Sequence, residues 1–412
     1  MDRLENTIRP YAWGSTTALP ELMGAEPTGE PQAELWMGAH PGAPSLVDRG
    51  SGPVSLTDVI AADPTAELGE PTVRALGPRL PFLLKLLAAE APLSVQVHPD
   101  RAQAAAGFAD EEARGVPLDA PHRNYKDANH KPELICALTP FDGLCGFRPA
   151  AEAADLLDAL DVGELKPYAD LLRAHPEADA LRETLTAVLS ADREALAGVV
   201  TRAAQAARRL AAEGPSRFTS SYDAVDRMER HFPGDPGVIA GMLLNPVRLS
   251  PGEALFLGAG VPHAYLRGLG VEIMATSDNV LRCGLTPKHI DVPELLRVVR
   301  FGATEPGVLR PEAVPGGAGG DAAGPVEERY PAPIEDFRLS RVDLVPDAAP
   351  HRFDDRTPQI LLCTAGRATL RAGDEQRDEL VLEPGRSAYV RAGEQVSATG
   401  VGTVFRATVA VA

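Results

Sequence analysis

Two stretches far apart in this chain share one pattern of turns and short strands. Residues 249–265, LSPGEALFLGAGVPHAY, align without gaps to residues 382–398, LEPGRSAYVRAGEQVSA. Both copies begin with Leu-x-Pro-Gly, continue with five residues, and end with x-Ala-Gly before the last five residues. Because Pro-Gly and the second glycine favour tight turns, the residues between them predict a strand in each copy. The chain is therefore expected to contain two related β units.

The two copies differ at one position that has metal-binding chemistry. His263 follows the last glycine of the first copy by three residues, and Val396 occupies the same place in the second. Such glycine-punctuated strands resemble the cupin barrel, a jelly roll in which this spacing places a histidine on a metal. The usual proline before the second turn is Gly258 here, a modest departure. The resemblance implies two cupin-like barrels, and the second is expected to bind no metal at this position.

The stretch PLSVQVHPD, residues 92–100, predicts a strand that lines a site. Successive strand residues point to opposite sides, so this strand would have two different faces. The aliphatic face carries Leu93, Val95 and Val97. The other face carries a hydroxyl, an amide and an imidazole, from Ser94, Gln96 and His98. A solvated face would more usually carry Lys, Glu, Thr or Arg.

Four scattered residues form a candidate metal site. If the strand lines the first barrel, Gln96 and His98 point inward and His263 approaches from another strand. Glu133 offers a fourth ligand, because the proline before it excludes a helix interior and the run after it predicts a strand. One amide oxygen, two imidazoles and one carboxylate suit zinc, with a further position for water or substrate. Spacing alone leaves an alternative open, in which hydrogen bonds satisfy these groups in a polar core.

The composition changes twice along the chain. Residues 1–148 mix short β-like runs with turns, whereas residues 149–245 have helical spacing and predict a helical insertion. The clearest helix spans residues 190–214, with Ser190 able to cap its start. Residues 303–327 are glycine-rich and predict a linker, and β-like runs alone follow it.

The expected fold class is mainly β with an α-helical insertion: two cupin-type jelly-roll barrels plus a helical domain. The expected domains are a catalytic barrel from residues 1–148 with 246–302, the insertion 149–245, the linker 303–327, and a C-terminal barrel, 328–412, without a metal site.

Charge and cysteine content narrow the class of protein. The net charge of −18 argues against nucleic acid or an anionic membrane as partner. No apolar run is long enough to span a bilayer, and the N-terminal residues lack the apolar segment of a secretion signal. The four cysteines form no C-x-x-C pair, which favours reduced thiols and a cytoplasmic location.

Lysine is scarce, because the chain has 35 arginines and only 5 lysines. Three of the lysines, Lys126, Lys131 and Lys288, fall in the motif segments quoted below, and Lys85 lies just before the strand at residues 92–98. Arginine can replace lysine on a solvated surface but not where a compact or titratable amine is required. The placement therefore favours functional roles for this group.

Two long segments resemble the signature segments of the type I mannose-6-phosphate isomerases. They are YKDANHKPE and, at residues 263–288, HAYLRGLGVEIMATSDNVLRCGLTPK. YAWGS, ELWMGAHPGAPS, PLSVQVHPD and FDGLCGFR also resemble stretches of that family. The match covers most of residues 8–148 and 245–300. One departure is Cys283, where alanine is more usual, and it exchanges one small residue for another.

The resemblance implies a zinc-dependent aldose–ketose isomerase of carbohydrate metabolism that interconverts mannose 6-phosphate and fructose 6-phosphate. The implied cofactor is one Zn²⁺ per chain, with ligands matching Gln96, His98, Glu133 and His263. The active-site arginine of the family matches Arg282. The implied partner is a small-molecule sugar phosphate, and a monomer is expected.

The implied reaction moves a proton between C1 and C2 through an enediol, so it needs a base and a positive charge near the developing oxyanion. Arg282 suits charge stabilisation or phosphate capture and is a poor base; an ion pair with Asp278 is the alternative. Glu272 is the favoured base, because it alternates with apolar neighbours in GVEIM. Its alternative role is to hold His263 or Lys131.

Other polar residues have more than one candidate role. Lys131 and Lys288 are rival acid–base candidates or hold the substrate. Ser94 and Lys288 are the favoured phosphate donors, since a phosphate needs several donors at once. His130 is expected to be a structural hydrogen-bonding residue rather than a ligand.

Two other classes of function stay open. A cupin enzyme that acts on another substrate class would more often use an H-x-H motif, which this chain lacks. A catalytically silent sugar-phosphate-binding cupin is the second alternative, and the presence of the four ligand candidates and Arg282 argues against it.

Overall fold

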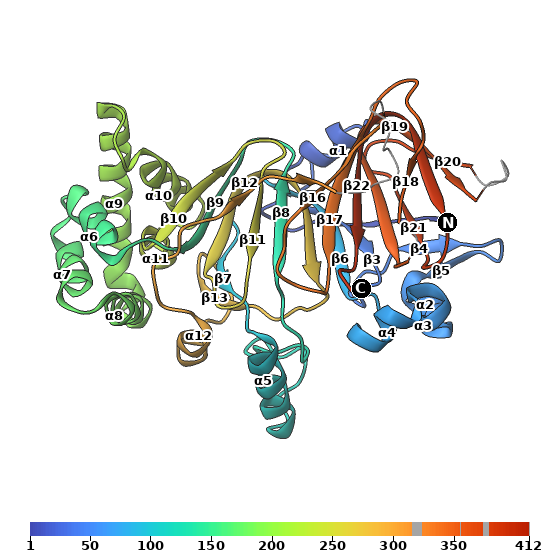
Figure 1. The fold of residues 1–412 in the computed structure, drawn as a ribbon. Helices are drawn as coiled ribbons and strands as arrows, with labels where there is room; N and C mark the ends of the chain where they lie inside the picture. The colour runs from blue at the N-terminus through green and yellow to red at the C-terminus, as the bar shows by residue number, and fades with distance from the viewer. Residues whose placement is uncertain (315–323, 355, 374–378, 412) are drawn as a thin grey trace.

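The computed structural model describes residues 1–314, 324–354, 356–373 and 379–411. The helices between residues 149 and 245 gather at one end of the molecule, a first sheet forms its middle, and a second sheet forms the other end (Figure 1). The fold is rich in sheets but mixed, since helices account for as much of the structure as strands do. The expectation of a mainly β fold therefore needs this correction.

Among the described residues, the first sheet has eleven antiparallel strands arranged around one long central strand. The central strand β12 (His263–Ala275) pairs with β7 and β9 through its first half and with β6 and β8 through its second half. The other strands are β2 (Thr7–Arg9), β3 (Glu34–Gly38), β6 (Phe82–Ala89), β7 (Val95–Val97), β8 (Glu133–Ala137), β9 (Phe141–Phe147), β10 (Leu244–Leu249), β11 (Ala254–Leu257), β13 (Leu281–Gly284) and β14 (Val308–Leu309).

The second sheet contains the C-terminal strands and also the start of the chain. Strand β1 (Asp2–Arg3) pairs with β21, so the N-terminal residues join a sheet built from the other end of the sequence. The remaining strands are β15 (Glu312–Ala313), β16 (Glu327–Tyr330), β17 (Arg338–Leu344), β18 (His351–Arg352), β19 (Gln359–Ala372), β20 (Glu379–Leu382), β21 (Ser387–Val390) and β22 (Val396–Thr408). A small separate ribbon is formed by β4 (Leu46–Asp48) and β5 (Pro53–Ser55).

The sequence repeat is confirmed as a structural repeat. Strands β11 and β21 begin and end at aligned positions, and so do the long strands β12 and β22. The turn glycines also match: Gly252 and Gly385 have φ of +88° and +79°, and Gly260 and Gly393 have φ of +78° and +82°. Side chains other than glycine rarely adopt this left-handed backbone. His263 and Val396 are the first residues of the two long strands.

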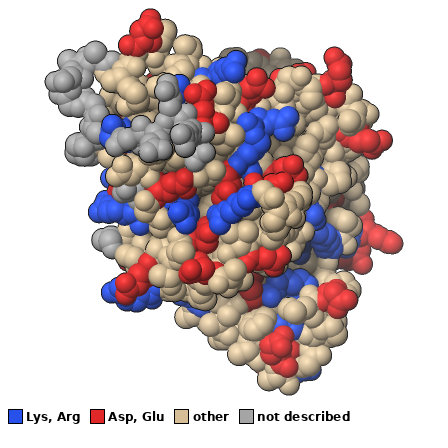
Figure 2. Space-filling view, turned by 90° about the vertical axis from the view of Figure 1, so that its right-hand side faces the viewer, with Lys and Arg blue, Asp and Glu red and all other residues tan. Residues whose placement is uncertain are grey.

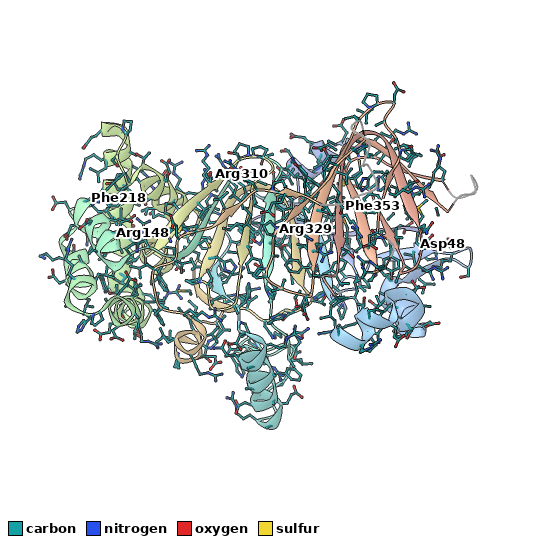
Figure 3. All side chains as sticks on the ribbon, viewed as in Figure 1. Asp48, Arg148, Phe218, Arg310, Arg329 and Phe353 are labelled. Atoms are coloured by element: carbon teal, nitrogen blue, oxygen red, sulfur yellow. The ribbon has the colours of Figure 1, made fainter. Side chains whose placement is uncertain are left out.

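The helical segment lies between β9 and β10 and is closed at its base by a buried arginine. Its helices are α6 (Ala150–Ala159), α7 (Lys166–Ala174), α8 (Glu177–Ser190), α9 (Arg193–Glu213), α10 (Thr219–His231) and α11 (Gly237–Met242), with a 3₁₀ turn at Gly163–Leu165. Arg148, labelled in Figure 3 where these helices meet the first sheet, donates two hydrogen bonds to the Leu244 carbonyl and one to Ser221 Oγ. These bonds tie the entry of the segment to its exit.

The helix expected over residues 190–214 begins later than predicted. Ser190 is the last residue of α8, and Asp192 caps α9 by accepting a hydrogen bond from the Ala195 N–H. Serine and aspartate are both good N-cap residues, so the pattern could not choose between them. The apolar face is as expected, with Leu196, Val199, Val200, Ala203 and Ala207 buried.

Helices also occur where the sequence suggested only strands and turns. They are α1 (Ala18–Met23), α2 (Leu56–Ala62), α3 (Pro64–Leu68), α4 (Glu70–Leu76), α5 (Arg101–Ala113) and, after β13, α12 (Val292–Val298). The expected linker 303–327 contains β14 and β15, and Glu327 already belongs to β16. Residues 315–323 of that linker lie outside the described residues.

The two sheets pack face to face over one shared apolar cluster. Leu84, Leu134 and Ile273 from the first sheet belong to the same buried cluster as residues from the second sheet, which include Leu339, Ile360 and Phe405. A separate cluster fills the interior of the first sheet, and another joins it to the helices. The C-terminal region is therefore part of one continuous packing scheme.

In the described parts of the chain, the charged side chains and the cysteines indicate no further binding site. On the face shown in Figure 2, basic and acidic side chains are interspersed. All four cysteines, Cys136, Cys145, Cys283 and Cys363, are free and buried. Within the described ranges, no helix has both the length and the apolar character needed to cross a membrane.

Candidate active site and metal centre

Three ligand-type side chains from three separate strands or loops converge inside the first sheet. His98, Glu133 and His263 each offer one ligand atom, and these atoms lie within 4.8 Å of one another. The Glu133 carboxylate is the centre of the group, with Oε1 3.4 Å from His98 Nε2 and Oε2 3.3 Å from His263 Nε2. All three residues are at most 1% exposed. The predicted convergence of these scattered residues is confirmed.

Backbone carbonyls orient both imidazoles. His98 Nδ1 lies 2.8 Å from the Asn279 carbonyl oxygen, and His263 Nδ1 lies 2.9 Å from that of Val261. Because a carbonyl only accepts, each Nδ1 carries the proton and each Nε2 presents a lone pair towards Glu133. Burial lowers the pKa of His98 to about 4, so the ring is neutral near pH 7. Metal-binding histidines are commonly fixed in this way.

Two atoms of the group are buried without a hydrogen-bond partner among the described residues: His98 Nε2 and Glu133 Oε2. Each such atom costs about 1–3 kcal/mol if nothing satisfies it. Although burial opposes ionisation, the Lys131 ammonium and the His98 ring hold the pKa of Glu133 well below its ordinary value. An ionised carboxylate between two imidazole lone pairs suits a divalent cation.

Gln96 lies in one row with His263 and Arg282. On β7 it is opposite His263 of β12 on one side and opposite Arg282 of β13 on the other. Opposite residues of antiparallel strands point to the same face, so the three side chains share a face. The Gln96 Nε2 atom is 3.4 Å from His263 Nε2. A half-turn of the amide would place its oxygen at this position, where an amide oxygen has the chemistry of a fourth donor.

The strand that carries Gln96 is shorter than predicted. Only Val95–Val97 forms β7, and Ser94 and His98 flank it. Val95 and Val97 pack into the cluster shared with the helices, whereas Leu93 packs into the interior cluster of the first sheet. The expected continuous alternation over residues 92–98 is therefore wrong at its start.

A cleft of about 690 Å³ reaches the ligand group through Glu133 and Gln96, which are part of its wall. Every candidate substrate or catalytic residue lines it: Ser94, Lys131, Glu272, Arg282 and Lys288. The wall also includes Trp13 and Tyr265, and His231 and Phe232 from the end of α10. The helical segment thus contributes to the cleft as well as to the scaffold.

Lys85 is a cleft residue whose position in the sequence favoured a functional role without indicating which one. Its ammonium is 2.9 Å from Glu272 Oε2 and 3.4 Å from Glu34 Oε1, and it lies over the Trp36 ring. The side chain is 7% exposed, and although burial opposes the charge, the carboxylates raise the pKa of Lys85, so it stays protonated. A lysine inside the apolar run LPFLLKLL was the available signal, because a buried ammonium needs acidic partners.

Glu272 reaches the cleft only because β12 contains a bulge. Its side chain is 2% exposed, and burial raises its pKa. The pairing register shifts between Tyr265 and Arg267. Without that shift, strict alternation would put Glu272 and His263, nine residues apart, on opposite faces. The prediction that Glu272 and His263 both point into the site is correct. It depends on the register shift in β12, which strict alternation does not predict.

Arg282 and Lys288 are cations without an acidic partner. Among the described residues, neither the Arg282 guanidinium nor the Lys288 ammonium forms a salt bridge. Both side chains line the cleft, where Arg282 is partly buried and Lys288 is exposed. Burial lowers the pKa of each, and for Lys288 the nearby Arg282 adds to the effect. Asp278, the alternative partner of Arg282, instead lies 3.4 Å from His40. Two unpaired cations in one cleft favour an anionic ligand.

Two neighbouring residues hold the site from outside. Asn279 is fully buried, and its side-chain oxygen accepts from the Lys126 and Asp127 backbone N–H groups, so it fixes the loop before β8. His130 forms a hydrogen bond with Asp336 and is not part of the His98–Glu133–His263 group. The expected structural role of His130 agrees with this contact.

Comparison with known proteins identifies the family. The family described as phosphomannose isomerase type I, catalytic domain, matches residues 1–150. The mannose-6-phosphate isomerase of Salmonella typhimurium is 42% identical over 409 residues, which cover 98% of this chain and 99% of the relative. The chain belongs to the type I mannose-6-phosphate isomerase family. The human member is 31% identical over 96% of this chain and 94% of its own length.

Solved structures of the family share the whole fold. A mannose 6-phosphate isomerase crystallised with zinc bound superposes with a TM-score of 0.86 at 39% identity, covering 99% of each chain. A second solved member carries zinc and yttrium and has the same TM-score at 38% identity. The similarity extends through the helical segment and the second sheet.

Proposed function

We propose that this protein is a mannose-6-phosphate isomerase that interconverts D-mannose 6-phosphate and D-fructose 6-phosphate. The observation that carries the proposal is one cleft whose wall contains Glu133 of the buried His–Glu–His group and, among the described residues, two cations without an acidic partner. The first feature suits a metal ion at the reacting end of a sugar, and the second suits a phosphate at the other end. The named relatives support the same substrate.

Zinc is the proposed metal, one ion per chain. His98, Glu133 and His263 would hold it, with Gln96 as the fourth donor, because two neutral imidazoles, a carboxylate and an amide oxygen form a suitable set. The orphaned His98 Nε2 and Glu133 Oε2 atoms fit this role. When bound, zinc supplies Lewis-acid polarisation and orients the sugar.

The phosphate would be bound at the Arg282 end of the cleft. Ser94 and Lys288 are the proposed donors, and Arg282 is shared between the phosphate and the negative charge that develops on the sugar oxygen. A permanent cation with a planar fork suits both partners. Because no carboxylate among the described residues pairs with Arg282, its charge is available to the substrate.

The proposed base is Glu272. It removes the proton from C2 of mannose 6-phosphate and returns it to C1, and in the reverse direction the carbons exchange roles. Burial raises its pKa, which brings it nearer to neutral pH and makes it a stronger proton acceptor. Lys85 keeps its charge beside Glu272 and would orient it. Lys131, which donates to Glu133, is proposed to act on the substrate oxygen or to hold it.

The proposed architecture is two cupin barrels with a helical insertion. The first comprises residues 1–148 with 246–302, and the second residues 328–412. The matched strands and turns of the repeat support this division, although Asp2–Arg3 pairs with the second sheet. We also propose that the protein acts as a monomer in the cytoplasm, which four free thiols and scattered single exposed apolar residues support.

A coupled assay on purified zinc-loaded protein tests the function. The expected result is reversible formation of fructose 6-phosphate from mannose 6-phosphate, lost on metal removal and regained on addition of zinc. A protein that binds mannose 6-phosphate and zinc but forms no fructose 6-phosphate would instead be a silent binding protein.

A further inference from the structure

A carboxylate from the second sheet region forms an ion cluster beside the metal site. Asp336 lies between β16 and β17 and is 6% exposed. Arg101 donates to both of its oxygens, at 3.1 and 3.2 Å, and His130 Nε2 lies 3.0 Å from Oδ2. Arg101 and His130 also contact each other at 2.9 Å. The three residues come from three distant parts of the sequence.

Each partner of Asp336 is three residues from a metal-ligand candidate. Arg101 follows His98, and His130 precedes Glu133. Pro99 and Pro132 lie within these two connections. Proline fixes its own φ and restricts the residue before it, so both connections have little conformational freedom.

The far end of the first connection is also fixed. Arg101 is the first residue of α5, and Asp100 caps that helix in a reciprocal pair of hydrogen bonds with Gln103. Movement of Arg101 therefore carries the start of α5 with it. On the inner side, the Asn279 carbonyl holds His98 while its side chain holds the backbone near residues 126–129.

We propose that Asp336 is a positioning residue that sets the separation of His98 and Glu133. It acts through Arg101 and His130 and does not touch the substrate or the ligands themselves. The second sheet, which has no metal candidate at the repeated position, thereby supports the metal site of the first. This inference rests on the proposed zinc-dependent function.

The energetics favour a local effect over a global one. The Arg101 side chain is 55% exposed, and ion pairs with such an exposed partner contribute about 0–1 kcal/mol to stability. Loss of this cluster should therefore leave the fold intact. Hydrogen-bond partners of metal ligands typically change metal affinity about 10- to 100-fold. Asp336 is linked to the ligand candidates only through the backbone connections from Arg101 and His130, so an effect of about tenfold or less is expected.

The test compares Asp336→Asn with Asp343→Asn in the full-length zinc-loaded protein. Asp343 lies on β17 nearby in sequence, is 57% exposed, and pairs with Arg341 and Thr403. The rate of zinc transfer to a chromogenic chelator, the kcat and KM for mannose 6-phosphate, and the melting temperature are measured for both. Asp336→Asn should release zinc about three- to tenfold faster and lower kcat, with KM and melting temperature close to wild type. Asp343→Asn should match wild type throughout.

A second variant keeps the test decisive if Asp336→Asn fails to fold. Arg101→Gln changes an exposed side chain and removes the same link, so it should fold and show the same faster zinc release. The double variant should be no worse than the more affected single variant, because the residues act as one unit.

Wild-type zinc release in Asp336→Asn, or a change equal to that of Asp343→Asn, would overturn the proposal. If the wild-type protein itself bound no zinc or formed no fructose 6-phosphate, the proposed function would fail instead.

Discussion

The two copies of the repeat have the same strands and turns but different side chains at the positions that correspond to the metal site. In the first sheet, His263 starts β12 and faces Gln96, and Glu133 pairs opposite Leu257. At the matching places of the second sheet, Val396 starts β22, and the Phe353 N–H donates to the Val396 carbonyl. Figure 3 labels Phe353 among the strands of the second sheet.

The third ligand position differs as well. Gln359 pairs opposite Val390 in the second sheet as Glu133 pairs opposite Leu257 in the first. Gln359 is fully buried and satisfied, because it accepts from Arg406 and donates to the Asp354 carbonyl. Phe353 and Val396 belong to the apolar core of that sheet. At these matched positions, one backbone pattern thus holds candidate metal ligands in the first copy and satisfied or apolar side chains in the second, so side chains and not strand geometry decide which copy has the site.

The largest effect is expected from making the first copy resemble the second. His263→Val removes one imidazole and should abolish zinc binding together with isomerase activity, by at least about a thousandfold, because the remaining donors no longer enclose an ion. Metal analysis and the coupled assay measure both losses. His175→Val, at an exposed histidine of the helical segment, is the control. Retention of zinc and near-normal turnover in His263→Val would remove His263 from the ligand set.

Glu272 has Phe405 at the aligned position of the second copy, so the proposed base has no counterpart there. Glu272→Gln should lower kcat by about 10²–10⁴-fold with zinc retained, since positioned acid–base groups contribute that much. Only the ionised carboxylate accepts a proton, and burial raises its pKa above the ordinary 4.5. Activity of the wild type should therefore fall, as the pH is lowered, at a higher pH than an ordinary glutamate would give. An acid limb at or below pH 4.5 would argue against Glu272 as base.

Replacing Arg282 tests whether its guanidinium stabilises the transition state. Arg282→Lys should lower kcat/KM at least about a hundredfold, which corresponds to about 2.7 kcal/mol of transition-state stabilisation. An ammonium keeps the charge but loses the planar fork. Arg267→Lys, on β12 and paired with Asp142, is the matched control and should be nearly silent. Equal activities in the two variants would assign Arg282 to the scaffold.

The buried polar network of the second copy should control stability and not catalysis. Although burial opposes ionisation of Glu327, His351 and Arg406 lower the pKa of its carboxyl group to about 2. Since the unfolded value is near 4.5, this group stabilises the fold fully above pH 4.5, and the contribution is lost as the pH falls through 2. Glu327→Gln should cost on the order of 3 kcal/mol near pH 7. Denaturant unfolding at pH 7 and pH 3 measures it, and an equal loss at both values would contradict the assignment.

The smallest effect on metal content is expected from the reverse exchange. Val396→His restores a histidine to the second copy, but Phe353 and Gln359 remain, so no donor set forms around it. Metal analysis should still give one zinc per chain, with some loss of stability from burying an imidazole. Two zinc ions per chain would show that a histidine at the start of the long strand is sufficient.

The sequence predicted the parts of the site that are local or belong to recognisable segments. The turn glycines, the strands of the repeat and the three ligands His98, Glu133 and His263 were all accessible, because each follows a turn or proline with a clear conformational preference. Arg282 was reached through its segment, and its lack of an acidic partner required coordinates.

The remaining features depend on contacts between distant residues. Lys85 gains its role only when Glu272 and Glu34 are brought beside it. The β12 bulge changes which face Glu272 occupies, and the Gly-x-Gly at 268–270 in front of it was the only local hint. Asp336 could not be connected with the site from the sequence, because its partners are more than two hundred residues away.

The most direct test of the central claim is the position of zinc in a crystal of the protein, measured by anomalous diffraction at the zinc absorption edge. The proposed four-donor site predicts a single peak per chain, bounded by the Nε2 atoms of His98 and His263, the Glu133 carboxylate and the Gln96 amide. A peak elsewhere, or no peak in a preparation that still isomerises mannose 6-phosphate after chelation, would contradict it.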